Sequence, residues 1–366
     1  MRIVVDCRYT RIGRHDGISR YTSGIVTELA KLHAVTMLIS DHRQLELLPS
    51  LPWEIVSAPT SIREPFVAYQ VNKLRPDVVF TPMQTMGSAG RRYKLVLTVH
   101  DLIYYRNRTP PRDLAWPIRL LWRLYHLAWW PQRLLLNRAD AVVTVSQTTR
   151  ALIREHNLTR RPVHVVSNAA DAPTAALAER AADRTAPRSH SLVYMGSFMP
   201  YKNVETIVRA LALLPGYRLH LMSRATDAEQ ARLQAIAPGA ALVFHNGASD
   251  AEYQEELAAA RALVTASFDE GFGIPLVEAM ALGTPVVVSD IPIFREIGAD
   301  AAVFFEPRSA EELARAIRSL EDSPEWAARS ARSVAVASRF TWAGSAEHLL
   351  TVLTATVSRA SGRRRL

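Results

Sequence analysis

Short apolar runs rich in β-branched residues alternate along the chain with longer helical stretches. Unbroken apolar runs of this length between helices predict strands that are buried on both faces. Because strands and helices alternate throughout, the pattern indicates an α/β fold with parallel sheets. The predicted strands lie at residues 3–6, 77–80, 95–100, 141–146 and 163–167 in the first half, and at 192–196, 218–222, 241–244, 262–266, 285–289 and 301–305 in the second.

The two sets of strands are separated by residues 171–190, which are rich in Ala, Pro, Arg and Asp and carry no strand pattern. We therefore expect two doubly wound, Rossmann-like parallel-sheet domains joined by a linker. Ligands of such sheets bind beyond the C-terminal strand ends, so two domains facing one another predict a ligand in the cleft between them. The expected boundaries are 1–172 for an N-terminal domain, 173–345 for a C-terminal domain and 346–366 for a final helix and basic tail, the helix packing back on the N-terminal domain.

Composition agrees with this organisation and excludes several classes of protein. A length of 366 residues suits two domains, and 21 Pro with 15 Gly are too few for a disordered or collagen-like chain. The single cysteine, Cys7, excludes a disulfide framework and a multi-cysteine metal site. The chain has no apolar run of about 18 residues, and its N-terminus has the pattern of a strand rather than a signal peptide, so we expect a cytoplasmic protein.

The net charge of +9 comes from the first half of the chain. Residues 1–170 contain 24 Lys and Arg against 12 Asp and Glu, a balance of +12, whereas residues 171–366 contain 20 against 23, a balance of −3. A basic half favours an anionic partner such as a phosphate, a nucleic acid or an acidic lipid surface. The alternative is a solvated basic face without a partner.

Residues 267–290 carry the most specific chemistry in the sequence. A predicted strand runs into a turn containing Gly271 and Gly273, and a helix begins near Pro275. The backbone N–H groups of such a turn and the positive end of the helix suit an anion. Glu270 stands on the turn and Glu278 within the helix, so the two carboxylates can accept hydrogen bonds from two sets of sugar hydroxyls.

This segment resembles the E-x7-E signature of retaining, nucleotide-sugar-dependent glycosyltransferases of family 4, which have the two-domain GT-B fold. The resemblance implies that Glu278 binds the ribose hydroxyls of the donor nucleotide and that Glu270 contacts hydroxyls of the donor sugar. It also implies that the donor sugar and diphosphate lie against the backbone of Gly271, Phe272, Gly273 and Ile274.

Residues 193–203 resemble the first strand and loop of the family's donor domain. Lys202 would there neutralise the donor diphosphate, as a point charge that stabilises the leaving phosphate. The family usually has an Arg beside this Lys or after the glycine, where this sequence has Tyr201 and Ser197. Either Arg224 supplies the second cation or Lys202 acts alone. The other donor-binding positions that the resemblance implies are Gly196, Ser197, Asn203 and Gly247.

In the N-terminal domain the resemblance points to a histidine and to the first loop. His100 ends a predicted strand and is expected close to the donor sugar and β-phosphate, with Asp101 orienting it or holding the turn; a structural histidine that caps a loop is the alternative. The loop after the first strand matches a glycine-containing loop whose amides approach the diphosphate and the acceptor. Its candidate residues are Gly13, Gly17 and Arg20, with Arg14 and His15 as further basic side chains.

The resemblance implies transfer of a hexose with retention, and His100, Lys202 and Glu270 are the expected catalytic residues. The acceptor hydroxyl attacks the anomeric carbon from the side that the diphosphate leaves, and a phosphate oxygen takes its proton. The protein then contributes positioning and charge stabilisation. The resemblance implies that no catalytic metal is needed, and the sequence contains no D-x-D carboxylate pair, so neither a metal nor a cofactor is predicted.

Residues 110–136 interleave tryptophans with arginines. Trp and Arg on an amphipathic helix suit a bilayer interface, and with the basic first half they predict an enzyme that docks on anionic membrane to reach a lipid-linked acceptor. The alternative is a helix whose aromatic side chains pack into the N-terminal domain. The residues concerned are Trp116, Trp122, Trp129, Trp130, Arg112, Arg119, Arg123 and Arg133.

The motifs at residues 100–102 and 271–285 are similar to those of bacterial mannosyltransferases that use GDP-mannose. We therefore expect mannose transfer to a lipid-linked or polysaccharide acceptor in cell-envelope glycan synthesis, by a cytoplasmic enzyme on the inner face of the membrane. A UDP-sugar-dependent glucosyl- or N-acetylglucosaminyltransferase is the alternative within the family. Outside it stand a GT-B-like sugar-nucleotide epimerase and a basic nucleic-acid-binding protein; the scattered charge and the absence of a nucleic-acid motif argue against the latter.

Overall fold

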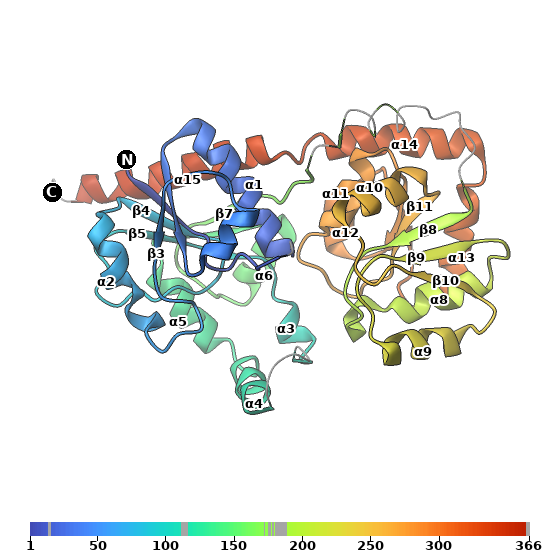
Figure 1. Ribbon diagram of the computed structural model, residues 1–366, viewed down its shortest axis with the longest axis horizontal. Coiled ribbons are helices and arrows are strands. Elements are labelled where there is room, and N and C mark those ends of the chain that lie inside the picture. The colour runs from blue at the N-terminus through green and yellow to red at the C-terminus, as the bar shows by residue number, and fades with distance from the viewer. Residues whose placement is uncertain are drawn as a thin grey trace. The chain divides into compact units, whose positions relative to one another are not determined.

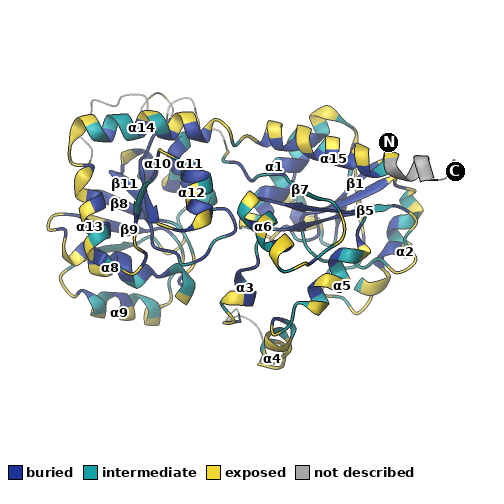
Figure 2. Cartoon of the chain, turned by 180° about the vertical axis from the view of Figure 1, so that it is seen from behind, coloured by how far each residue is buried: buried dark blue, intermediate teal, exposed yellow. Residues whose placement is uncertain are grey.

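The computed structural model describes residues 1–13, 16–110, 116–171, 173, 174, 177, 179 and 189–363, with side chains up to residue 358. The chain divides into two compact units (Figure 1). Unit 1 comprises Met1–Ala169 and Thr341–Leu366, and unit 2 comprises Ala170–Phe340. Each unit is a parallel sheet with helices on both faces, and the central strands are the most buried part of each (Figure 2). The predicted α/β class with two doubly wound parallel sheets is therefore confirmed.

The sheet of unit 1 contains seven strands within the described ranges, in the order β3-β2-β1-β4-β5-β6-β7, all paired in parallel. Alternate side chains of its central strands enter a core closed by α2, α5 and α6. The strands are β1 (Ile3–Asp6), β2 (Val35–Ile39), β3 (Trp53–Ile55), β4 (Val78–Thr81), β5 (Lys94–Val99), β6 (Ala141–Thr144) and β7 (Val163–Val165). The helices are α1 (Gly17–Leu32), α2 (Val67–Val71), α3 (Ile103–Arg106), α4 (Trp116–Tyr125), α5 (Trp130–Arg138), α6 (Gln147–Glu155) and α15 (Trp342–Arg363), with short 3-10 helices η1 (His42–Leu47), η2 (Glu64–Phe66) and η3 (Asn72–Leu74).

Two strands of unit 1 were not predicted from the sequence. β3 is the edge strand, and all three of its residues are exposed, so it lacks the apolar run by which buried strands were recognised. β2 follows α1 after a gap of two residues, and its apolar residues continue the periodicity of that helix. Both belong to the half of the sheet that lies beyond β1.

The last helix, α15, belongs to unit 1. It packs along α1, where the ring of Trp342 lies 2.5 Å from the position that a Cβ on Gly24 would take and makes an edge contact with Tyr21, with ring centroids 6.1 Å apart. Ser345 donates a hydrogen bond of 2.8 Å to the carbonyl of Ser167. Because these contacts begin at the first turn of α15, the chain returns to unit 1 after Phe340. The sequence analysis placed this boundary after residue 345. It placed the earlier boundary after residue 172, whereas unit 1 ends at Ala169.

The sheet of unit 2 has six strands in the part of the chain that is described, in the order β10-β9-β8-β11-β12-β13, again paired in parallel. The strands are β8 (Ser191–Tyr194), β9 (Arg218–Leu221), β10 (Ala241–Phe244), β11 (Ala262–Thr265), β12 (Val286–Ser289) and β13 (Val303–Phe305). The helices are η4 (Pro200–Lys202), α8 (Val204–Ala212), α9 (Asp227–Ile236), α10 (Asp250–Ala259), α11 (Ile274–Ala281), α12 (Pro292–Gly298), α13 (Ala310–Ser319) and α14 (Ser323–Ala337).

In both sheets the strand order reverses at one point, between β1 and β4 in unit 1 and between β8 and β11 in unit 2. Loops after the two strands at such a point leave the sheet in opposite directions and open a crevice at the C-terminal strand ends, which is where doubly wound sheets bind ligands. The fold thus marks the loops after β8 and β11 as the place to look for a site.

Several sequence expectations lie outside the described residues: the side chains of Arg14 and His15, residues 111–115, most of the expected linker 171–190, and the basic tail. No helix among the described residues combines the length and apolar character needed to cross a bilayer.

Candidate active site

The loops at the switch point of unit 2 bring together two of the expected catalytic side chains. Lys202, after β8, and Glu270, after β11, form an ion pair with Nζ and Oε1 2.5 Å apart. The side chains keep 16% and 14% of their surface exposed, so both are reachable from solvent. Ser267 donates a further hydrogen bond of 2.9 Å to the same carboxylate oxygen. A cation and an anion are thus held side by side where the fold expects a ligand.

Asn203 fixes the loop that carries Lys202. It has left-handed backbone torsions, with φ 51° and ψ 42°, and ends the η4 turn directly before α8. Its amide nitrogen donates to the carbonyls of Ala266, at 3.0 Å, and Pro307, at 2.7 Å. The hydroxyl of Thr206 donates to its Oδ1 at 2.9 Å. The side chain is buried and engaged by the protein on both sides, so it positions Lys202 against the end of β11.

The turn between β11 and α11 presents backbone rather than side chains. Gly273 is the N-cap of α11 with φ 95°, a conformation that a side chain would strain, and the ring of Phe294 lies 3.1 Å from where its Cβ would be. Gly271 is buried, and Phe272 is buried with its ring packed edge-on against Phe340 at 5.5 Å. The half-buried Ile274 begins α11, so the turn delivers the N-terminal amides of that helix to the site.

Glu278 lies on the second turn of α11 and is half-buried. Glu278 is just over one turn from the N-terminus of α11. With Asp171, Pro173 and Gln254 it lines a small pocket. The two carboxylates of the E-x7-E segment therefore stand at the turn and on the helix, which is the arrangement that the sequence predicts.

The remaining donor-site candidates of unit 2 are on the loops after β8, β9 and β10. Gly196 donates its N–H to Ser223 at 3.2 Å, and the exposed Ser197 accepts a hydrogen bond of 2.7 Å from Tyr194 through its carbonyl. Gly247 has φ 100°, and the exposed side chain of Arg224 lies across it, with Cγ 2.8 Å from the position that a Cβ would take. Arg224, which the sequence offered as a second cation if Lys202 does not act alone, is thus associated with the Gly247 turn.

In unit 1, His100 stands at the C-terminal end of β5. Its Nε2 donates to the carbonyl of Pro82 at 2.7 Å. The rings of His100 and Tyr21 make an edge-to-face contact with their centroids 5.0 Å apart. Burial lowers the pKa of His100 below the usual 6.5. The imidazole is therefore neutral at pH 7, and since Nε2 carries the proton, Nδ1 presents a lone pair.

His100 lines a pocket of about 130 Å³ in unit 1. Its walls include Gln84, Asp101, Tyr104 and His126, so polar groups and aromatic faces share the cavity. His100 thus lies beside a small cavity whose lining offers both hydrogen-bonding groups and aromatic faces.

The first loop of unit 1 leads into α1 through a capped turn. Gly13 has φ 71°, and Gly17 is the first residue of α1, with Asp16 as the N-cap whose carboxylate accepts from the N–H of Ser19 at 2.8 Å. Arg20 lies on the first turn of the helix, half-buried, and donates its backbone N–H to the carbonyl of Asp16 at 2.9 Å. Gly17 and Arg20 thus lie on the first turn of α1, and Gly13 lies on the loop that precedes the helix.

Two family models match the chain along most of its length. "Glycosyltransferase Family 4" matches residues 15–172, and "Glycosyl transferases group 1" matches residues 178–334, which contain the Lys202–Glu270 pair. The chain belongs to glycosyltransferase family 4. It is an enzyme of a family of retaining hexosyltransferases.

Curated relatives of this glycosyltransferase include several mannosyltransferases. The O-antigen chain mannosyltransferase RfbU of Salmonella typhimurium is 25% identical over 332 residues, covering 86% of this chain and 90% of that protein. An O-antigen chain mannosyltransferase B of Escherichia coli is 31% identical over 170 residues, covering 41% and 42%.

Solved structures place the glycosyltransferase in the GT-B fold. The complex of Anabaena HepE with UDP and glucose aligns with a TM-score of 0.71 at 19% identity, over 97% of this chain and all of the other. WaaG, a glycosyltransferase involved in lipopolysaccharide biosynthesis, aligns with a TM-score of 0.69 at 18% identity, over 96% and 99%. At these identities the likeness concerns the fold.

Sequence reasoning missed one buried charge cluster of this glycosyltransferase. Arg8, two residues after the end of β1, donates to both oxygens of Asp6, at 2.8 and 2.9 Å, and to both oxygens of Glu64, at 2.6 and 3.1 Å. Glu64 also accepts from the N–H of Gly87 at 3.1 Å. The cluster ties the loops at the end of β1 and β4, the switch point of unit 1. An Arg two residues after a strand-end Asp was the available signal.

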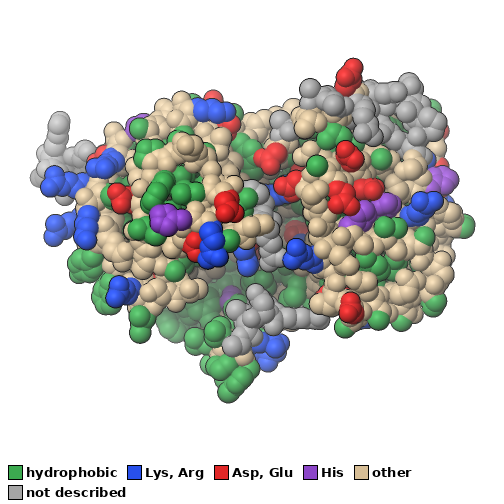
Figure 3. Space-filling view, viewed as in Figure 1, with side chains coloured by type: hydrophobic (Ala, Val, Ile, Leu, Met, Phe, Trp, Pro, Cys, Tyr) green, Lys and Arg blue, Asp and Glu red, His purple; other side chains and the backbone are tan. Residues whose placement is uncertain are grey.

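The Trp- and Arg-rich segment divides into two parts. Trp122 packs on His126, with rings 4.1 Å apart, and Trp129 stacks on Tyr105 at 3.8 Å, so these two side chains pack within unit 1. Trp116 and Trp130 are exposed by 76% and 65%. Apolar side chains gather on the surface of α4 and its flanks (Figure 3). The exposed members are Trp116, Ile118, Leu120, Leu121, Leu124, Leu127 and Trp130, which we call the α4 patch.

Proposed function

We propose that this glycosyltransferase transfers mannose from GDP-mannose to a lipid-linked or polysaccharide acceptor in cell-envelope glycan synthesis. The mannosyltransferases among its relatives support the choice of sugar. Family membership favours sugar transfer over the epimerase and the nucleic-acid-binding protein considered from the sequence.

The Lys202–Glu270 pair is the observation that carries the proposal. A nucleotide sugar ends in two adjacent groups of opposite preference, a diphosphate that needs a cation and sugar hydroxyls that need an acceptor. The donor exchanges the ion pair for these contacts: Lys202 binds the diphosphate, and Glu270 accepts from the sugar hydroxyls. The N-terminal amides of α11 add fixed positive charge at the phosphates. Glu278, further along α11, binds the ribose.

Transfer proceeds on one face of the donor. The acceptor hydroxyl forms the new bond to the anomeric carbon while the bond to the diphosphate oxygen breaks, and the hydroxyl proton passes to a phosphate oxygen. Lys202 stabilises the negative charge that develops on the leaving diphosphate. His100, neutral and with Nδ1 as acceptor, takes a hydrogen bond from a sugar hydroxyl and thereby orients it.

The α4 patch supports docking on a membrane. Isolated exposed apolar residues are ordinary, but a group of them along one helix and the residues that follow it marks an interaction surface. Arg119 and Arg123 on the same helix add positive charge beside it, as interfacial helices on anionic lipid do. Attachment on the inner face of the cell membrane would bring the enzyme to a lipid-linked acceptor.

A donor screen by thermal unfolding tests the proposal, because at equal concentration a ligand that binds the native state more tightly raises the melting temperature further. We expect GDP-mannose and GDP to raise it more than UDP-glucose and UDP-N-acetylglucosamine at equal concentration. Stabilisation by the UDP-sugars alone would instead select the second candidate, a UDP-sugar-dependent transferase, which the HepE complex with UDP and glucose favours. Stabilisation by none of these ligands would reject a nucleotide-sugar site.

A further inference from the structure

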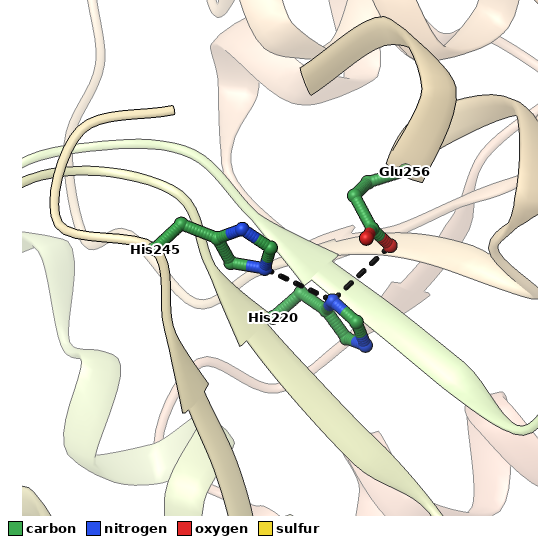
Figure 4. Close-up of side chains that lie close together, drawn as sticks. All are labelled: His220, His245 and Glu256. Atoms are coloured by element: carbon green, nitrogen blue, oxygen red, sulfur yellow. Dashed lines mark hydrogen bonds and ion pairs between the residues drawn. The ribbon is translucent and has the colours of Figure 1, made fainter. Parts of the chain in front are cut away.

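Two histidines and a glutamate meet on one face of the unit 2 sheet, outside the machinery described above (Figure 4). His220 lies on β9, His245 directly follows β10, and Glu256 lies on α10. β9 and β10 pair so that Val243 stands beside His220, which puts His220 and His245 on the same face. Glu252 and Glu256 lie one helical turn apart on α10 and both reach toward that face.

The distances suit a shared metal ion. His220 Nδ1 is 3.1 Å from His245 Nε2 and 3.1 Å from Glu256 Oε2, and the three atoms all lie within 4.8 Å of one another. Ligands of tetrahedral zinc, with bonds of about 2.0–2.1 Å, stand about 3.3 Å apart. The side chains of His220, His245 and Glu256 are exposed by 14%, 11% and 28%, so the centre is sheltered yet has an open side.

Proton counting shows why hydrogen bonds alone serve this cluster poorly. Nδ1 of His245 lies 2.8 Å from Glu252 Oε1, and since a carboxylate only accepts, this nitrogen carries the proton. In the neutral ring Nε2 of His245 is then an acceptor. His220 Nδ1 faces this acceptor and the Glu256 carboxylate with a single hydrogen at most. One hydrogen is left to satisfy two acceptors, whereas a cation binds all three lone pairs at once.

Glu252 completes the pattern of a metal centre. A metal-bound histidine usually donates its second ring N–H to a carboxylate, which fixes the tautomer and directs the other nitrogen at the metal. Glu252 does this for His245. Arg218, at the start of β9, is the opposing charge in the neighbourhood, and it is exposed, so solvent screens it.

We propose that His220, His245 and Glu256 bind a divalent transition-metal ion of the zinc class, with Glu252 as the positioning residue for His245. Two imidazoles and a carboxylate select this class over Mg²⁺, which prefers oxygen ligands. The ion would cross-link β9, the edge strand β10 and α10. It would thereby brace the turn at Gly247, two residues beyond His245, against which Arg224 lies. The sequence predicted no metal because the three ligands come from separate elements without a motif spacing.

The test uses the untagged full chain after EDTA treatment and dialysis, with ZnCl2, CoCl2 and MgCl2 as probes. We expect one Zn²⁺ bound per chain in calorimetry, a zinc-dependent rise in melting temperature, and no rise with MgCl2. Co²⁺ should give the intense visible absorption of a low-symmetry, four-coordinate site.

The variants His245→Ala and Glu256→Gln should each lose at least 100-fold in zinc affinity, and Glu252→Gln should lose about 10–100-fold. His42→Ala, an exposed histidine of unit 1, is the matched control and should bind as the parent does. His245 follows the edge strand β10 and Glu256 is a partly exposed residue of α10, so these variants are expected to fold, which circular dichroism without metal verifies. Zinc affinity equal in parent and variants, or no binding by the parent, would overturn the proposal. Donor stabilisation measured with EDTA present tests the glycosyltransferase site separately.

Discussion

At the scale of single residues, the proposed donor site depends on the ion pair between Lys202 and Glu270. Without a donor the two charges neutralise each other in a partly exposed position. Such pairs contribute little to stability. Their removal should therefore affect catalysis far more than folding.

Lys202→Met and Glu270→Gln should each lower kcat/KM for sugar transfer by about 10²–10³, the usual cost of removing one group that stabilises a transition-state charge. The melting temperature should stay near that of the parent. Arg232→Ala removes a surface ion pair of the same unit, with Glu205, and is the matched control with unchanged transfer. Full activity of both site variants would contradict the assigned roles.

His100 predicts a pH dependence of stability. Burial lowers its folded pKa below the usual 6.5, so on acidification the unfolded chain takes up the proton first. Stability that is complete above about pH 6.5 is then lost as the pH falls below that value. Burial also lowers the pKa values of His126 and His220. Both residues are still present in the His100→Gln variant, so the difference between parent and variant reports on His100 alone.

Melting temperatures of the parent and His100→Gln, measured from pH 7.5 to 5.5, should diverge, with the parent losing more. Parallel curves would show that His100 is not held neutral by the fold.

At the scale of elements, the contact between α1 and α15 depends on a glycine. A Cβ on Gly24 would meet the Trp342 ring at 2.5 Å, closer than any side chain tolerates. Replacing a helical glycine with alanine stabilises the helix by up to about 1 kcal/mol, but overpacking costs about 1–3 kcal/mol. The overpacked group here is the Trp342 ring, which also contacts Tyr21.

Gly24→Ala should therefore lower the free energy of unfolding, as measured by urea denaturation. Gly239→Ala, where no atom lies within 4 Å of the added Cβ, serves as its control and should leave stability unchanged. If the Gly24 variant proves as stable as the parent, α15 does not pack on α1 as described.

The elements also show what sequence reasoning can reach. Central strands such as β5 and β11 can be predicted from the sequence because both faces are buried and their residues form apolar runs. The edge strand β3 is exposed and has no such apolar run. In the candidate site, the resemblance to family motifs singled out Lys202 and Glu270, and the fold brings these two side chains together. The role of Asn203 depends on the carbonyls of Ala266 and Pro307, and the partners of Arg8 include Glu64, contacts that only the folded chain defines.

At the scale of the whole molecule, the basic balance and the α4 patch point to the same partner. Residues 1–170 hold the entire positive excess, and the exposed apolar helix belongs to the same part of the chain. In the proposed docking, anionic lipid would attract the positive charge, and the apolar side chains would enter the boundary of headgroups and acyl chains.

Vesicle co-sedimentation should show binding to anionic lipid at low salt that weakens as salt rises. The double substitution Leu121→Glu with Leu124→Glu should reduce binding at least tenfold without unfolding, because both side chains are exposed, by 67% and 55%. Ile62→Glu, at a side chain exposed by 94% elsewhere in unit 1, is the control. Equal vesicle binding by the parent, the double variant and Ile62→Glu would show that the α4 patch does not bind the membrane.

The return of α15 to unit 1 has a consequence for dissecting the enzyme. Residues 1–169 expressed alone would leave the face of α1 around Tyr21 without its cover, and such a fragment should aggregate. A circularly permuted polypeptide that starts at Thr341, runs through α15 and continues by a flexible tether into Met1–Ala169 would retain every native contact of that half. This rearranged order of segments, rather than simple truncation, should yield an autonomous half-enzyme.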